Sequence, residues 1–241
     1  MSKEKKTRVA ALGDIHVRES DAGRYRDLFA DISENADLLV LCGDITNRGL
    51  PGEAETLAEE LRSCKIPVLG VLGNHDAECG HEDEVKKIVC QAGMILLEDE
   101  PHEALGVGFA GVRGFCGGFD SHMLAPFGEK MIKEFVQETV NEALRLESGL
   151  LRLRTEHKVA VLHYAPIRDT VVGEPPEIFP FLGSSRFQEP IDRFDVSVCF
   201  HGHAHHGAPE GKTVKGIPVY NVAHAIMLSI DADRPYRVVE L

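Results

Sequence analysis

Short apolar runs alternate with amphipathic segments over the first half of the chain. The apolar runs lie at 7–13, 38–42 and 67–72, and each ends at or before a glycine that polar residues follow. Uninterrupted runs of this length are typical of strands that are covered on both faces. Apolar residues recur with helical spacing at 21–35, 51–64 and 82–92. This alternation predicts βαβ units around a largely parallel sheet.

The pattern changes in the middle of the chain. Met94–Leu97 and Val107–Val112 have the pattern of strands but no helix between them, so we expect an antiparallel middle. The segments 114–127 and 167–185 are irregular, the first rich in Gly and aromatic residues and the second in Pro. Long loops in compact domains are often functional, so the first segment is a candidate wall of a substrate site, and the shape of the pocket would depend on both segments. The apolar residues of 115–127 could equally form a dimer contact.

The second half of the chain contains one long predicted helix, at 129–153. Its expected buried stripe consists of Met131, Phe135, Val136, Leu144, Leu146 and Leu150 or Leu151. A short helix is predicted at 186–193, and strands are predicted at 158–162, 196–200, 214–222, 225–231 and 236–241. No low-complexity linker or repeat divides the chain, so we expect a single two-sheet α/β domain over residues 1–241.

Polar side chains that can bind metal follow five of the predicted strands. They are Asp14 and His16, Asp44, Asn74 and His75, His163, and His203 and His205. Taken singly, each has a structural explanation, such as a turn, a helix cap or a hydrogen-bonded core histidine. The joint pattern indicates a site, because ligands collect at the carboxyl ends of strands in α/β sheets. Asp14 and His16 are expected on one side of an extended segment, because a single residue separates them.

These residue types define the chemistry of the predicted site. Imidazole and carboxylate ligands suit Zn, Mn, Fe, Co or Ni, and the absence of thiolates from the set argues against a structural zinc site. The set holds more ligands than one tetrahedral ion uses, and two ions sharing Asp44 would lie about 3.5–4 Å apart, as in two-metal hydrolases. Two carboxylates against two divalent ions leave a net positive site, which would attract phosphate and lower the pKa of a bound water.

Five motifs occur in order along the chain. They are Asp-x-His at 14–16, Gly-Asp-x-x-x-Arg-Gly at 43–49, Gly-Asn-His-Asp at 73–76, the lone His163, and Gly-His-x-His at 202–205. In this order they resemble the motifs of the calcineurin-like metallophosphoesterases, and they cover nearly the whole chain. The resemblance implies a four-layer α/β/β/α sandwich of two mixed sheets.

The resemblance also implies a role for each matching residue. The first metal would be held by Asp14, His16, Asp44 and His205, and the second by Asp44, Asn74, His163 and His203. His75 would be the proton donor or transition-state partner, Asp76 would orient the ring of His75, and Arg48 would contact phosphate. The cofactors would be two divalent or mixed-valence transition-metal ions, with Mn or an Fe/Mn pair favoured.

The implied reaction is phosphoester hydrolysis by a metal-bridging hydroxide that attacks phosphorus in line. A phosphodiester in a small or nucleotide-like substrate is favoured, because phosphoprotein phosphatases of this family are usually longer and carry an arginine-rich phosphate clamp. Arg113, Arg168 and Arg186 are either substitutes for that clamp or surface residues. The alternatives are a metal-binding scaffold with weak catalysis, a phosphomonoesterase and a nuclease. The intact His75 argues against the scaffold.

Composition narrows the expected partners. The 241-residue chain has a formal net charge of -13, which disfavours a long nucleic acid, because affinity for one comes mainly from Lys and Arg on phosphates. No apolar run approaches the ~20 residues that span a bilayer, and the charged start contains no signal segment, so we expect a cytoplasmic protein with no membrane partner.

The six irregularly spaced cysteines are expected to be free thiols. The oligomeric state stays open, as do the roles of His201, His206 and His224, although a structural role is favoured for His224.

Overall fold

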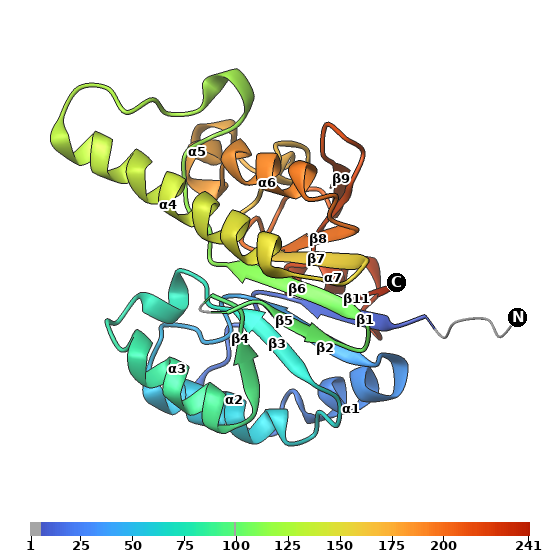
Figure 1. Ribbon diagram of the computed structural model, residues 1–241. Helices are drawn as coiled ribbons and strands as arrows, with labels where there is room; N and C mark the ends of the chain where they lie inside the picture. Colours follow the sequence, from blue (N-terminus) through green and yellow to red (C-terminus); the bar gives the residue numbers. More distant parts are fainter. Residues whose placement is uncertain (1–5, 99) are drawn as a thin grey trace, which may run out of the picture.

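Two β-sheets lie face to face in the middle of the molecule, and helices cover their outer faces (Figure 1). The computed structural model describes residues 6–98 and 100–241, so the charged start at 1–5, where we expect no signal segment, lies outside the described residues. The predicted α/β/β/α arrangement of two mixed sheets is confirmed. Among the helices of the described residues, none combines the length and the apolar character that crossing a membrane requires.

The first sheet is mostly parallel. Its strands run in the order β11 (Arg237–Glu240), β1 (Arg8–Leu12), β2 (Leu38–Cys42), β3 (Val68–Val71) and β4 (Met94–Leu96). β1 to β4 are parallel to one another, whereas β11 pairs with β1 in antiparallel register. The outer face of this sheet is covered by α1 (Arg26–Asn35), α2 (Pro51–Leu61) and α3 (Glu82–Gln91).

The second sheet has parallel strands in its centre and antiparallel strands at its edges. Its order is β5 (His102–Ala104), β6 (Val107–Val112), β7 (His157–Leu162), β8 (Val198–His201), β10 (Pro218–Asn221) and β9 (Glu210–Lys212). The outer face is covered by α4 (Lys130–Arg152) and α6 (Gln188–Arg193). The remaining helices are α5 (Phe179–Leu182), between β7 and β8, and α7 (His224–Ile230), directly after β10.

The central strands are buried on both faces because each lies between a helical layer and the opposite sheet. In β1, Val9 and Ala11 pack between the two sheets, whereas Ala10 and Leu12 pack against the helices. This explains the unbroken apolar runs of the sequence, since both alternating faces of these strands need apolar side chains. The six cysteines are free, as predicted.

The prediction of an antiparallel middle, based on the strands at Met94–Leu97 and Val107–Val112, is wrong. β4 pairs with β3 and β6 pairs with β7, both in parallel, so β4 and β6 belong to different sheets. The antiparallel neighbour of β6 is β5, a short edge strand with half-exposed side chains. Its sequence carries no apolar alternation, which is why the pattern did not reveal it.

The predicted stripe of α4 is correct only in part. Val136, Leu146 and Leu150 are buried, whereas Met131 is 79% exposed, and Leu144 and Leu151 are also exposed. The first turns of α4 extend beyond the sheet, so they have no surface to cover (Figure 1).

The predicted strand at 225–231 is instead helix α7. Ile226 and Met227 of this helix pack into the space between the sheets. A short apolar run cannot be assigned to strand or helix by periodicity alone, so the error follows from the length of the segment.

Candidate metal centre

Side chains that follow the parallel strands of both sheets converge at one edge of the sandwich. Three overlapping groups could each hold a metal ion: Asp14, His16 and His205; His16, Asp44 and His75; and Asp44, His163 and His203. Within each group the potential ligand atoms lie within 4.8 Å of one another. His16 and Asp44 each belong to two of the groups, and Asp44 links the groups that contain His16 to the group of His163 and His203, as a ligand shared between two ions would.

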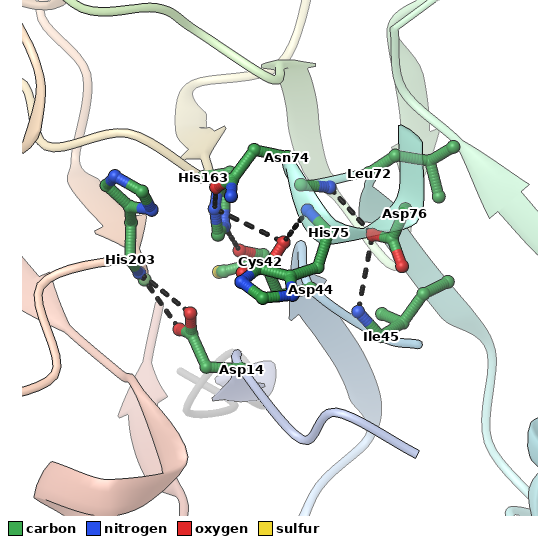
Figure 2. A network of polar contacts seen from close by, with 12 residues as sticks. Asp14, Cys42, Asp44, Ile45, Leu72, Asn74, His75, Asp76, His163 and His203 are labelled. Atoms are coloured by element: carbon green, nitrogen blue, oxygen red, sulfur yellow. Dashed lines mark hydrogen bonds and ion pairs between the residues drawn. The ribbon is translucent and has the colours of Figure 1, made fainter. Parts of the chain in front are cut away.

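Asp14 joins the first sheet to the loop after β8. Both oxygens of its buried carboxylate accept from the backbone N–H of His203, at 3.0 and 2.9 Å (Figure 2). Nε2 of His205 lies 2.9 Å from the same carboxylate. The structure therefore brings the first and the last of the predicted ligands along the chain into direct contact.

His163 lies between the second sheet and the two loops that carry Asp44 and Asn74 (Figure 2). Its Nδ1 is 3.0 Å from the carbonyl oxygen of Cys42, which can only accept a hydrogen bond, so Nδ1 carries the proton of the neutral ring. Nε2 then presents a lone pair to Asn74 Oδ1 at 2.8 Å and to Asp44 Oδ1 at 3.5 Å. Acceptors that converge in this way fit a cation between them.

His16 gives the most direct test of whether the centre suits a metal. Both ring nitrogens of His16 are buried and have no hydrogen-bond partner among the described residues. An unpaired buried polar atom costs about 1–3 kcal/mol, so such atoms are rare without a function. Nε2 lies 3.8 Å from Asp44 Oδ2, and the ring meets that of His205 edge to face. A metal ion would give one of these two ring nitrogens a partner, so the residues present fit the predicted cofactor.

Four of the predicted ligands adopt left-handed backbone conformations. Their φ angles are 55° for Asp14, 46° for His16, 48° for Asp44 and 69° for His203. The segment from Asp14 to His16 is therefore not extended, contrary to our expectation. Such conformations are sparsely populated by residues other than glycine, and they concentrate at functional sites, where the surroundings hold them in place.

Two glycines allow the ligand loops to approach one another. A Cβ at Gly73 would collide with the carboxylate of Asp44, and a Cβ at Gly202 would collide with the carboxylate of Asp14. The glycines beside the ligands in the sequence motifs are thus required by the close packing of the loops.

The two buried carboxylates have pKa values shifted in opposite directions. Burial, reinforced by the charges of Asp14 and Asp76, raises the pKa of Asp44 to about 9. Burial also acts to raise the pKa of Asp14, but the hydrogen bond from His205 and the neighbouring imidazoles outweigh it and lower that pKa to about 2. A divalent ion would offset the repulsion between these carboxylates and favour the ionised form of both.

Three histidines of the centre favour the neutral form of the ring, whereas the hydrogen bond to Asp14 raises the pKa of His205. Burial lowers the pKa of His16 to about 4, and it also lowers the pKa values of His163 and His203. Neutral imidazole is the form that binds metal, so these rings need not release a second proton to do so.

Comparison with known protein families identifies the centre. The model of the calcineurin-like phosphoesterase family matches residues 7–207, which is most of the chain. The chain belongs to the calcineurin-like phosphoesterase family. Membership indicates a metal-dependent phosphoester hydrolase with a dinuclear centre, and the side-chain groups described above are its candidate ligands. A search of the curated proteins finds no match.

Solved structures of other proteins share the fold of this phosphoesterase. Phosphopantetheinyl hydrolase from Mycobacterium tuberculosis has a TM-score of 0.68 and 14% identity, over 98% of this chain and 97% of that one. The protein TT1561 of Thermus thermophilus has a TM-score of 0.57 and 13% identity, over 98% and 99% of the two chains. A purple acid phosphatase from yellow lupin seeds has a TM-score of 0.52 and 14% identity, over 84% of this chain and 38% of that one.

His75 and Arg48 lie at the open side of the phosphoesterase centre. The backbone N–H of His75 donates to Asp44 Oδ1 at 2.9 Å, and its ring Nδ1 lies 2.8 Å from the carbonyl oxygen of Asn47. The side chain of His75 is 38% exposed, which leaves Nε2 accessible. Nε of Arg48 is 3.4 Å from Glu78, which also lies beside the His75 ring.

Asp76 has a different role from the predicted one. Its fully buried carboxylate accepts from the backbone N–H groups of Ile45, Thr46 and Gly73 at 3.3, 2.8 and 2.7 Å, and from the Thr46 hydroxyl at 2.6 Å. No hydrogen bond to the ring of His75 is among its contacts within the described chain (Figure 2). Asp76 thus joins the ligand loop after β2 to the ligand loop after β3.

The two irregular segments pack against each other beside the centre. Gly118 of the first segment donates through its backbone N–H to the carbonyl of Gly183 in the second, at 2.8 Å. The carbonyl of Phe181, also in the second segment, lies 3.2 Å from Nε2 of the predicted ligand His203. The second segment therefore reaches the metal centre.

The arginines considered as a phosphate clamp lie outside the three ligand groups. Arg113 follows β6 and pairs with Glu82 of α3 at 2.6 Å. Arg168 lies over the ring of Phe179, and Arg186 bonds through its backbone N–H to Ser184. None of the three replaces Arg48 beside His75.

The three unassigned histidines differ in their surroundings. His201 is buried, with its ring nitrogens 2.8 Å from Thr170 Oγ1 and from the carbonyl of Gly202, so it supports the ligand loop. His206 is exposed. His224 begins α7 and lines a cavity together with Asp14, His16 and His205. His224 follows β10 closely, as the predicted ligands follow their strands. The strand that we predicted at 225–231 hid this position in the sequence.

Proposed function

We propose that the chain is a dinuclear metal-dependent phosphodiesterase that acts on a small or nucleotide-like substrate. The observation that carries the proposal is the double membership of Asp44 in the potential metal-binding groups. Two ions, for which Mn²⁺ or an Fe/Mn pair is proposed, would be held by Asp14, His16, Asp44 and His205 and by Asp44, Asn74, His163 and His203.

The residues around the centre suit phosphoester hydrolysis. Bound metal ions supply Lewis acidity that activates water and offsets charge on the phosphoryl oxygens. Arg48, whose side chain is 57% exposed at this edge, is available to bind a phosphoryl oxygen with charge-assisted hydrogen bonds. His75 donates through Nδ1 to the Asn47 carbonyl, so its Nε2 can hold a second proton for the leaving oxygen. Proton donation of this kind typically contributes about 10²–10⁴ in rate.

The charge of the chain favours a small substrate. A formal net charge of -13 disfavours a long polyanion, whereas a small phosphoester would meet mainly the local positive charge of the loaded centre. A long nucleic acid is therefore not proposed as a partner.

Hydrolysis of chromogenic esters by the Mn²⁺-loaded chain tests the proposal. We expect turnover of bis(4-nitrophenyl) phosphate, and we expect Asp44→Ala and His163→Ala to abolish it. His157→Ala is the matched control, because His157 is an exposed residue at the opposite end of the same strand, β7. Wild-type activity in Asp44→Ala or His163→Ala would refute the proposed centre.

The same assay separates the alternative functions. Faster turnover of 4-nitrophenyl phosphate than of the diester would favour a phosphomonoesterase. Tight metal binding without turnover of either ester would favour a binding scaffold, despite the intact His75.

A further inference from the structure

A cavity of about 370 Å³ opens beside the ligand group of Asp14, His16 and His205. These three ligands line one part of the cavity. The rest of its lining includes Arg18, Asp21, Arg24, Tyr25, His224 and Leu228. A group in this cavity would therefore lie next to the first metal position, and the volume is near the lower end for ligand sites, about 300–1,000 Å³.

The two carboxylates of this cavity, Asp14 and Asp21, already accept hydrogen bonds from the protein. The two oxygens of Asp21 accept from the backbone N–H of Arg18 at 2.9 Å and from Nη1 of Arg24 at 3.0 Å. Tyr25 donates its hydroxyl to the carbonyl of Ile15 at 2.9 Å, so it offers mainly a ring surface. The Asp14 carboxylate is engaged by the histidine loop, as described above.

The donors of this cavity are largely unused. The Arg18 guanidinium has no hydrogen bond and no ion pair with any residue in 6–98 or 100–241. Arg24 uses one of its five N–H groups on Asp21, and its guanidinium lies 5.5 Å from the centroid of the Tyr25 ring. The ring of His224 also lines the cavity, and its centroid lies 6.2 Å from that of Tyr25. A cavity with spare cationic donors, and with carboxylates that are already hydrogen-bonded, suits an anion.

We infer that this cavity is the subsite for a second anionic group of the substrate, a phosphate or a carboxylate, attached near the phosphorus that reacts at the metal centre. The inference rests on the proposed function, because it assigns the reacting phosphate to the neighbouring ions. Arg18 and Arg24 bind the second anion, and Tyr25 and Leu228 cover the linking atoms. The preferred substrates are accordingly small phosphoesters with two anionic groups.

Binding of phosphonates to the Mn²⁺-loaded chain tests this inference by calorimetry. Methylphosphonate carries one anionic group, methylenediphosphonate adds a second phosphonate, and phosphonoacetate adds a carboxylate. The quantity compared is the ratio of the dissociation constant of methylphosphonate to that of each two-anion probe. We expect Arg18→Gln and Arg24→Gln each to lower this ratio about tenfold or more, since a charge-assisted hydrogen bond is lost.

Arg62→Gln is the matched control, because Arg62 is an exposed arginine at the end of α2 that pairs with its neighbour Glu59. It should leave the ratio unchanged. An effect confined to methylenediphosphonate identifies a second phosphate as the ligand, and an effect confined to phosphonoacetate identifies a carboxylate. Unchanged ratios in both Arg18→Gln and Arg24→Gln would overturn the inference and leave the proposed function intact. No binding of methylphosphonate to the metal-loaded wild type would overturn the proposed function as well.

Discussion

Replacing Asp76 by Asn should destabilise the chain by about 2–6 kcal/mol. Oδ1 of Asp76 accepts from the N–H and the hydroxyl of Thr46, and an amide oxygen can keep both bonds. Oδ2 accepts from the N–H groups of Ile45 and Gly73, and an amide nitrogen there would face two donors. Each buried donor without a partner costs about 1–3 kcal/mol, which gives the range for the pair.

Urea unfolding of the metal-free chain measures this difference in the free energy of unfolding. Burial raises the pKa of Asp76 and the bound N–H groups oppose that shift, so the comparison belongs at a fixed pH near 7. Glu78→Gln in the same turn is the control, because Glu78 is half-exposed and its contacts are screened by water, so we expect a change within about 0.5 kcal/mol. Wild-type stability of Asp76→Asn combined with slow turnover would refute this reasoning and restore Asp76 as the residue that orients His75.

Individual contacts give three further predictions. His16→Leu should leave the metal-free chain at least as stable as the wild type, because it removes two unpaired buried nitrogens. The same change should abolish the rise in melting temperature caused by Mn²⁺. Lower stability of the variant without metal would contradict this prediction. Gly202→Ala should weaken Mn²⁺ binding about tenfold or more by calorimetry, because the added Cβ collides with Asp14, and unchanged affinity would exclude that collision. Burial raises the pKa of Glu98 above 4.5, so its ionisation opposes folding and stability is lost as pH rises from 4.5 through the raised value. Glu98→Gln should remove this loss from unfolding curves recorded upward from about pH 4.5, and an equally steep decline in the variant would contradict it.

The sequence predicted the strands of the central layers and the residues at their ends. Strands such as β2 are covered on both faces, so their apolar runs are unbroken and their ends are visible. The carboxyl ends of parallel strands meet at one edge, and for this reason Asp14, Asp44 and His163 could be predicted to converge although they lie far apart in the chain.

Features that depend on tertiary neighbours could not be predicted. The left-handed backbone at Asp14 and His16 arises from packing against other loops, and nothing in the local sequence specifies it. The exposure of Met131 depends on where the sheet beneath α4 ends. Most of the partners of Asp76 belong to Ile45 and Thr46 in a distant loop, and a motif carries no information about them. The position of His224 at the start of a helix was not predicted, because the short apolar run after it can form either a strand or a helix.

Anomalous diffraction from crystals grown with Mn²⁺ would show directly whether Asp44 is shared between two ions. We predict two peaks at the edge where the two sheets meet, about 3.5–4 Å apart, with the carboxylate of Asp44 contacting both. No peak at this edge, or a single peak that Asp44 does not contact, would contradict the dinuclear centre.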